Sequence, residues 1–270
     1  MKKIQEMLQE ARLSDCITYL EVQLRDDPLN VDLKSSFIEL LCINGELERA
    51  DKQLNYMVQK HPDFLIGAAN LRQLILAEQS RQDFLIGKSV PHLFTPSDAH
   101  IEAFMKLRVE MKQGDQQSIT KSVLALEEER PETTVELNGE SVKEFRDLDD
   151  SLGGFIEIFG TDGKYYIAQI KDIEYIYFKP LSSLIEQVWR RVELSIKNGP
   201  SGEAHIPLVY ANSITDAEKL GRETDWQETV PDVMVGLGQK MWFVNDQAVP
   251  LSNFIKLLLF IRLAFLKPTL

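Results

Sequence analysis

The chain is poor in the residues that build disulfide frameworks and metal centres. It has two cysteines and four histidines among 270 residues. Cys16 and Cys42 are not part of a C-x-x-C motif, and the histidines lie far apart without ligand spacing. We therefore expect no metal site and two reduced cysteines that serve packing, as in a cytoplasmic protein.

Common catalytic and nucleotide-binding motifs are also missing. The sequence has no G-x-S-x-G elbow, no phosphate-binding loop and no H-E-x-x-H. Gly236 and Gly238 are not followed by the third glycine of a dinucleotide fingerprint, so we interpret them as a tight turn or bulge before the strand MWFV. Because these motifs are missing, we predict neither an enzyme nor a cofactor.

Basic charge is scarce and long apolar runs are few. The net charge of −12 argues against a nucleic-acid partner and is compatible with a basic or amphipathic peptide. Residues 1–15 alternate apolar and charged side chains, unlike a signal peptide, so we expect a cytoplasmic location. The last stretch, LLLFIRLAFLKPTL, is interrupted by Arg262 and too short to span a bilayer. We expect a docked terminal helix there; the alternative is a helix in a membrane interface.

The first half of the chain has a periodic pattern of prolines. Prolines recur at intervals of 34, 34 and 35 residues, at Pro28, Pro62, Pro96 and Pro131. A period near 34 is typical of tetratricopeptide-like repeats, in which the proline ends the second helix of each α-hairpin. We expect residues 1–131 to form such a repeat domain. The alternative is a helical domain in which this spacing is accidental.

Other residues recur in phase with the prolines. Seventeen residues before a proline, at the turn within each hairpin, stand Ala11, Gly45 and Gly114. Twelve residues before, where the helices cross, stand Cys16, Ala50 and Ile119, and eight residues before stand Leu20, Leu54 and Val123. The unit that ends at Pro96 fits poorly. We place the start of the next helix there, with Thr95 as N-cap and Pro96 as first helical residue.

After Pro131 the pattern changes to alternation. An Asn-Gly turn within ETTVELNGESV and the GTDG between FIEIF and YYIAQI predict hairpins, and IEYIYF predicts a further strand. VELSI with HIPLVY, and MWFV with AVPL, predict two more strand pairs. LSSLIEQVW has helical spacing, and Ser213 with Asp216 suggests a cap for a short helix. We expect residues 132–270 to form an antiparallel β-rich domain, so the whole chain is α+β.

Two groups in this half could carry chemistry. Asp147, Asp149 and Asp150 form a dense carboxylate cluster that could hold a cation, although accepting backbone N–H bonds in a turn is the simpler role. The second group combines tryptophans with charged residues, at Trp189, Arg190, Arg222, Asp225 and Trp226. An arginine there could stack on tryptophan or pair with Asp225, which would specify the fold or contribute to a partner surface.

The order of these blocks resembles the ImpE (TagJ, SciE-type) family of type VI secretion accessory proteins. The matching blocks are DLDDSLGGFIEIF, KYYIAQI, Trp189-Arg190, IPLVY, LGRETDW and GLGQKM. Besides the charged and aromatic residues above, they contain Leu152, Gly153, Gly236 and Gly238, whose role we expect to be structural. Departures occur at 143–145, Ser151 and Gly154, and in the tail after Leu257.

The resemblance implies a non-catalytic adaptor with tetratricopeptide-like repeats before an α+β domain. Its implied partner is the small subunit of the contractile sheath, through that subunit's N-terminal helix, with an influence on sheath recycling by an AAA+ ATPase. In the repeat register, the groove positions for such a helix are Ser35, Glu39, Cys42, Gln73 and Arg108.

Two other functions stay open from the sequence alone. The first is an enzyme whose acidic site combines the three aspartates with Arg222 and Asp225. It requires these side chains to converge in a polar cleft. The second is a peripheral membrane protein anchored by LLLFIRLAFL.

Overall fold

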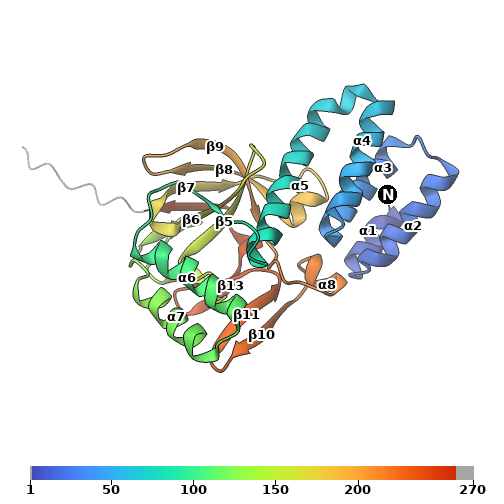
Figure 1. Cartoon of the computed structure of the whole chain (residues 1–270). Coiled ribbons are helices and arrows are strands. Elements are labelled where there is room, and N and C mark those ends of the chain that lie inside the picture. The colour runs from blue at the N-terminus through green and yellow to red at the C-terminus, as the bar shows by residue number, and fades with distance from the viewer. Residues whose placement is uncertain (1, 260–270) are drawn as a thin grey trace, which may run out of the picture.

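The computed structural model describes residues 2–259. It begins with two α-hairpins and a long helix, which stand side by side on one side of the molecule (Figure 1). These helices are α1 (Lys2–Gln9), α2 (Leu13–Asp26), α3 (Val31–Asn44), α4 (Leu47–Lys60) and α5 (Leu65–Leu85).

The first two hairpins have the predicted repeat register. Ala11 and Gly45 adopt positive φ angles of 55° and 85° at the turns, a conformation that needs a small or permissive residue. Pro28 and Pro62 follow the ends of α2 and α4. The crossing and packing positions of both units are buried, namely Cys16, Leu20, Ala50 and Leu54.

The third unit departs from the repeat. After α5 the chain forms β1 (His92–Leu93), which pairs in parallel with a strand of the main sheet. A last hairpin follows, α6 (Ala99–Gln113) and α7 (Gln116–Glu128), with Gly114 at its turn in the left-handed region. This hairpin lies beside the β-strands, away from α1 to α4 (Figure 1).

The predicted start of α6 is wrong by three residues. Asp98 is the N-cap, not Thr95, and its Oδ1 accepts a hydrogen bond from the Ile101 N–H at 3.0 Å. The other carboxylate oxygen of Asp98 binds Lys171, which fixes the cap to the sheet domain. Thr95 instead donates its hydroxyl to Asp172 at 3.1 Å. Asp98 thus offers the helix an acceptor that tertiary contacts hold in place.

The second half is built from antiparallel strands, as predicted. Among the described residues, nine strands form a sheet in the order β1-β6-β5-β9-β8-β7-β14-β2-β3. Its strands, besides β1, are β2 (Val135–Leu137), β3 (Glu140–Val142), β5 (Phe155–Gly160), β6 (Tyr165–Gln169), β7 (Ile173–Phe178), β8 (Trp189–Ile196), β9 (Ser201–Pro207) and β14 (Lys256–Leu259). The predicted Asn-Gly hairpin is β2–β3, where Asn138 and Gly139 both have positive φ.

Up to Leu259, this half also contains two smaller sheets. One has three strands in the order β13-β12-β4, and the other is a two-stranded ribbon of β10 and β11. Their bounds are β4 (Phe145–Asp147), β10 (Thr224–Val230), β11 (Val233–Gly238), β12 (Met241–Val244) and β13 (Gln247–Pro250). The MWFV and AVPL prediction is confirmed by the β12–β13 pair.

Three local predictions need correction. LSSLIEQVW forms only a short 3-10 turn at Ile185–Gln187, because Trp189 already belongs to β8 and pairs with Pro207. The short helix α8 (Asp216–Lys219) is capped by Thr215 with Glu218 in a capping box, not by Ser213. Leu257–Leu259 lie in β14 and pair with β2, so they are strand, not helix; the rest of the apolar tail lies outside the described residues.

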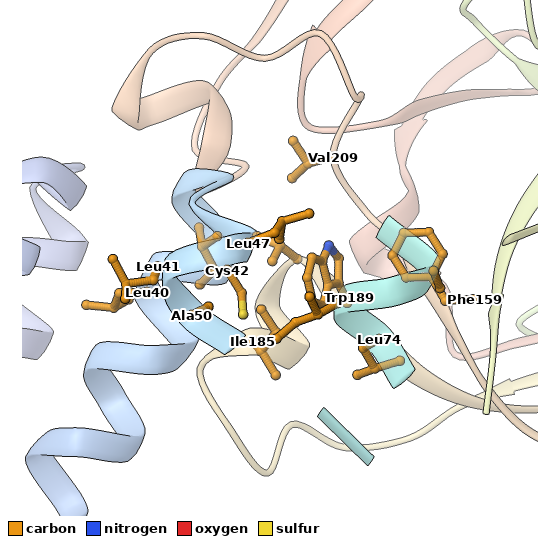
Figure 2. Packing of buried hydrophobic residues seen from close by; sticks show 14 of the residues in the cluster. Leu40, Leu41, Cys42, Leu47, Ala50, Leu74, Phe159, Ile185, Trp189 and Val209 are labelled. Carbon is orange, nitrogen blue, oxygen red and sulfur yellow. The ribbon is translucent and has the colours of Figure 1, made fainter. Parts of the chain in front are cut away.

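The helices and the main sheet share one hydrophobic core. Phe84 on α5 and Phe104 on α6 stack at 6.0 Å between ring centroids, and Phe104 contacts Phe155 on β5 at 4.6 Å. In Figure 2, Trp189 lies between Cys42 of α3 and Phe159 of β5. We propose that the chain has two domains, residues 1–131 and residues 132–270, and that this core joins them. No helix within residues 2–259 has the length and apolar character to cross a membrane.

Candidate functional site

A cluster of buried charged side chains joins α5 to the sheets. The Arg81 guanidinium binds both carboxylate oxygens of Glu157 on β5, at 2.8 and 2.7 Å. Lys240, in the turn between β11 and β12, bridges Glu157 at 2.9 Å and Asp147 at 3.2 Å. The Arg81, Glu157 and Lys240 side chains are each at most 5% exposed. Interior charges that are paired in this way hold the elements that carry them in one arrangement.

Two tyrosines extend this cluster. Tyr165 donates its hydroxyl to Glu157 at 2.8 Å, and Tyr210 donates to Asp147 at 2.7 Å. Burial and the neighbouring carboxylates raise the pKa of both tyrosines, so both hydroxyls stay protonated and act as donors. Each carboxylate at the centre therefore has both a cation and a hydroxyl as partners.

The central carboxylates differ in protonation tendency. Burial alone would raise the pKa of Glu157, but Arg81 and Lys240 hold it well below its usual range. Burial raises the pKa of Asp147, and the single cation Lys240 only partly opposes this. Burial also raises the pKa of Glu78, next to Arg81 on α5. Glu157 is thus the fixed anion of the cluster.

The acidic motif organises turns. Asp147 accepts a hydrogen bond from the Asp149 N–H, and Asp149 accepts from the N–H of Ser151 and of Gly236. Asp150 accepts from the Met234 N–H at 2.8 Å. The three aspartates thus accept backbone N–H bonds in and around this turn, and two of them, Asp149 and Asp150, also fasten β11 to the loop after β4. Within residues 2–259 no group of three or more His, Cys, Asp or Glu side chains is arranged to hold a metal ion.

The glycines of the motifs allow close approach. A Cβ on Gly236 would overlap the Tyr210 ring, and one on Gly238 would overlap the Glu223 carbonyl. Gly238 ends β11 with a φ of 76°, as expected for a tight turn before β12. Gly153 also has positive φ, and its carbonyl accepts from the Asp147 N–H at 2.8 Å, while Leu152 is buried.

The tryptophan and arginine group does not converge. Trp189 is buried and packs edge-on against Phe159, while Arg190 donates to the Glu186 carbonyl. Trp226 is half-buried and contacts the Tyr210 ring. The remaining two residues, Arg222 and Asp225, are exposed and form no ion pair with each other. The polar cleft that an acidic-site enzyme would need is therefore not formed by these residues.

The five predicted groove residues are split among four places. Ser35 and Glu39 line a cavity of about 400 Å³ between α3, α4, α5 and residues 182–186. Cys42 is buried at 2% exposure, and its burial raises the pKa of the thiol. Gln73 lies against Gly163 in the β5–β6 turn. Arg108 donates to the Ser151 carbonyl and lies over Phe104. Only Ser35 and Glu39 therefore line this cavity.

The sequence analysis missed Arg81, Glu157, Tyr210 and Lys240. A signal was present, because Glu157 is the one charged residue in FIEIF and Lys240 comes two positions after Gly238. A charge inside an apolar strand whose neighbours are buried on both faces requires a partner. That partner is Arg81, which lies 76 residues away in the sequence and cannot be identified from the local pattern.

Comparison with known proteins adds three similarities. The family model described as ImpE protein matches residues 139–257. The chain is 25% identical over 250 residues to the type VI secretion system accessory component TagJ of Pseudomonas aeruginosa, covering 90% of this chain and 85% of that protein. It is 37% identical to protein VPA1032 of Vibrio parahaemolyticus, whose crystal structure superposes with a TM-score of 0.92 over 97% of this chain and 99% of the other.

Proposed function

Because the chain belongs to the ImpE/TagJ family, we propose that it is a non-catalytic adaptor of a bacterial type VI secretion system. The observation that carries this proposal is the similarity to TagJ, an accessory component of such a system, over 90% of the chain. That span includes both the helical hairpins and the sheets. The buried charge cluster supports a structural role for the shared motifs, because its members bind one another and the backbone.

The partner that we propose is a sheath component, bound through the N-terminal helix of the small sheath subunit. By holding this helix, the adaptor would modulate sheath assembly or its recycling by the AAA+ ATPase, in the cytoplasm. The cavity beside α3, α4 and α5 supports this proposal, since grooves between helices accept amphipathic helices through apolar contacts. The net charge of −12 suits a partner segment with basic residues.

Calorimetric titration tests the proposal. The purified full-length protein is titrated with the N-terminal peptide of the small sheath subunit from the same gene cluster, at low and at high salt. We expect saturable binding that weakens at high salt, because screening reduces attraction between the acidic protein and a basic peptide. A scrambled peptide of the same composition is the control. Equal heats from the native and scrambled peptides would reject the sheath helix as partner.

A further inference from the structure

The open cavity that contains Ser35 and Glu39 is lined by both halves of the chain. Helices α3, α4 and α5 supply apolar residues to its wall, including Ile38, Leu54, Met57 and Leu71. The opposite wall comes from Ser182–Glu186 and from Arg191, Glu203 and His205 on β8 and β9. Residues 182–186 are held in place because the Ile185 N–H donates to Glu39 at 2.9 Å. The helical side of the cavity is thus mostly apolar, with Glu39 as its one carboxylate, and the sheet side is mostly polar.

Glu39 is the carboxylate of this cavity that lacks a cation. Arg191 lies 3.2 Å from Glu186 and 3.6 Å from Glu203. Glu39 forms no ion pair with any lysine, arginine or histidine among residues 2–259, and its one side-chain hydrogen bond is to the Ile185 N–H. Burial raises the pKa of Glu39, and the nearby Glu186 adds to this effect. A cation brought into the cavity would therefore find an acceptor that the protein leaves unneutralised.

His205 adds a buried polar side chain to the sheet side of the cavity. Its side chain lines the cavity and is 9% exposed, yet its Nδ1 has no hydrogen-bond partner among the described residues. Burial lowers its pKa to about 4, so the imidazole is neutral and has one donor and one acceptor nitrogen. A buried polar atom without a partner is uncommon and requires explanation.

The rim of the cavity is apolar and exposed. Phe64 lines the mouth with 41% of its surface exposed, and Leu65 and Ile66, next in the chain, are 58% and 77% exposed. Contiguous exposed apolar residues beside a cavity are typical of protein-binding sites. An amphipathic helix whose apolar face covers this rim could direct one polar side chain inward.

We propose that this cavity is the docking site of the partner helix, and that it receives one lysine or arginine of that helix in an ion pair with Glu39. The proposal rests on the proposed adaptor function and adds to it a location and a recognition chemistry. The apolar neighbours of the basic residue, three or four positions away on the same helix face, cover Phe64, Leu65 and Ile66. The small sheath subunit's N-terminal helix is the occupant to which the proposal commits.

Two pairs of variants test the site in the full-length protein. Glu39→Gln removes the charge but keeps an acceptor for the Ile185 N–H, and Glu48→Gln, on the exposed side of α4, is its matched control. Gly67 lines the cavity, and a Cβ there meets nothing within 4 Å. Gly67→Leu places a bulky side chain at the mouth, whereas Gly67→Ala adds one methyl group and serves as its control.

The readout is calorimetric affinity for the sheath-subunit peptide described above. We expect Glu39→Gln to weaken binding about 10-fold or more and Gly67→Leu to weaken it at least as much, because a desolvated charge pair and the space for it are lost. Glu48→Gln and Gly67→Ala should bind like the unmodified protein. A second peptide carries norleucine in place of the contacting basic residue. This peptide should bind the Glu39→Gln variant and the unmodified protein with equal affinity.

The outcomes separate this inference from the proposed function. If the unmodified protein binds the peptide and all four variants bind equally well, the helix docks elsewhere and this site is rejected while the adaptor function stands. If the unmodified protein does not bind, the sheath helix is rejected as partner and as occupant of the cavity. Loss of binding confined to Glu39→Gln and Gly67→Leu supports both.

Discussion

Arg81 and Glu157 bind each other through two parallel hydrogen bonds of 2.8 and 2.7 Å in the interior of the protein. Arg81 belongs to α5, in the helical first half of the chain, and Glu157 lies in the middle of β5. Arg81 also donates to the Val209 carbonyl at 3.0 Å, so one guanidinium contacts two separate segments of the second half. The pair therefore fixes how α5 lies on the sheet.

We predict that Arg81→Met lowers the free energy of unfolding by about 3–5 kcal/mol, because Glu157 and the Val209 carbonyl lose buried partners. Urea denaturation followed by circular dichroism measures this change. Arg49→Met is the control, since Arg49 pairs with Glu21 and Glu46 at the surface and should cost about 1 kcal/mol or less. Equal losses in the two variants would contradict the structural role of the Arg81 pair.

A second prediction concerns Gly236. Its position on β11 lies directly against the Tyr210 ring, so Gly236→Ala must displace the ring and weaken its hydrogen bond to Asp147. We expect a loss of about 1–3 kcal/mol in unfolding free energy. Gly67→Ala, in an open position of α5, should instead stabilise by up to about 1 kcal/mol through helix propensity. Thermal denaturation of both variants would show shifts of opposite sign, and a neutral Gly236→Ala would contradict the tight packing of Tyr210.

Local chemistry made much of the fold predictable. The turns at Ala11 and Gly45 and the Asn138-Gly139 hairpin need residues that accept positive φ, and that requirement is visible in the sequence. The turn role of the aspartates was predictable for the same reason, since Asp149 bonds to Ser151 only two residues away. Structural features that depend on near neighbours in the sequence can be predicted from the sequence.

What the sequence concealed depends on distant contacts. The helix predicted at LSSLIEQVW has suitable apolar spacing, but Trp189 gains its place through pairing with Pro207 and packing on Phe159. The groove prediction likewise assumed a free concave surface. In the structure Cys42 is buried and residues 182–186 lie over α3, because the second half packs into part of that surface.

The N-cap of α6 offers a third prediction. Asp98 caps α6 and also binds Lys171 and Gln169, whereas Asp115 caps α7 at an exposed position through Ser118. Asp98→Ala should cost about 2 kcal/mol and Asp115→Ala about 1 kcal/mol or less. The bonds to Lys171 and Gln169 offset burial and hold the pKa of Asp98 below its usual range. Its contribution is therefore complete above about pH 5 and declines as the pH falls from there and the carboxylate protonates.

The difference between these two cap variants should consequently shrink when urea denaturation is repeated near pH 2.5. A constant difference would show that the Asp98 carboxylate stabilises the protein without its charge. Asn at position 98 would keep a capping oxygen but not the ion pair with Lys171, so it should recover only part of the loss at neutral pH.

The last prediction uses the buried His205. Burial lowers its pKa to about 4, below the ordinary value near 6.5. Between these two pH values the unfolded chain binds a proton at His205 and the native protein does not. The resulting loss of stability begins as pH falls below about 6.5 and is complete near pH 4. Between pH 7 and pH 5 it amounts to about 2 kcal/mol.

We expect His205→Asn to lose less stability than the unmodified protein over this interval, by about that amount, in urea titrations at pH 7 and pH 5. His100 is also buried and has a lowered pKa, but it is present in both proteins and its effect cancels in the difference. His92→Asn, at an exposed position, is the control and should follow the unmodified protein. The contradicting outcome is equal acid sensitivity of His205→Asn and His92→Asn. It would mean that His205 becomes protonated in the folded protein, and that its imidazole is open to water and not enclosed beside Glu186 and Arg191.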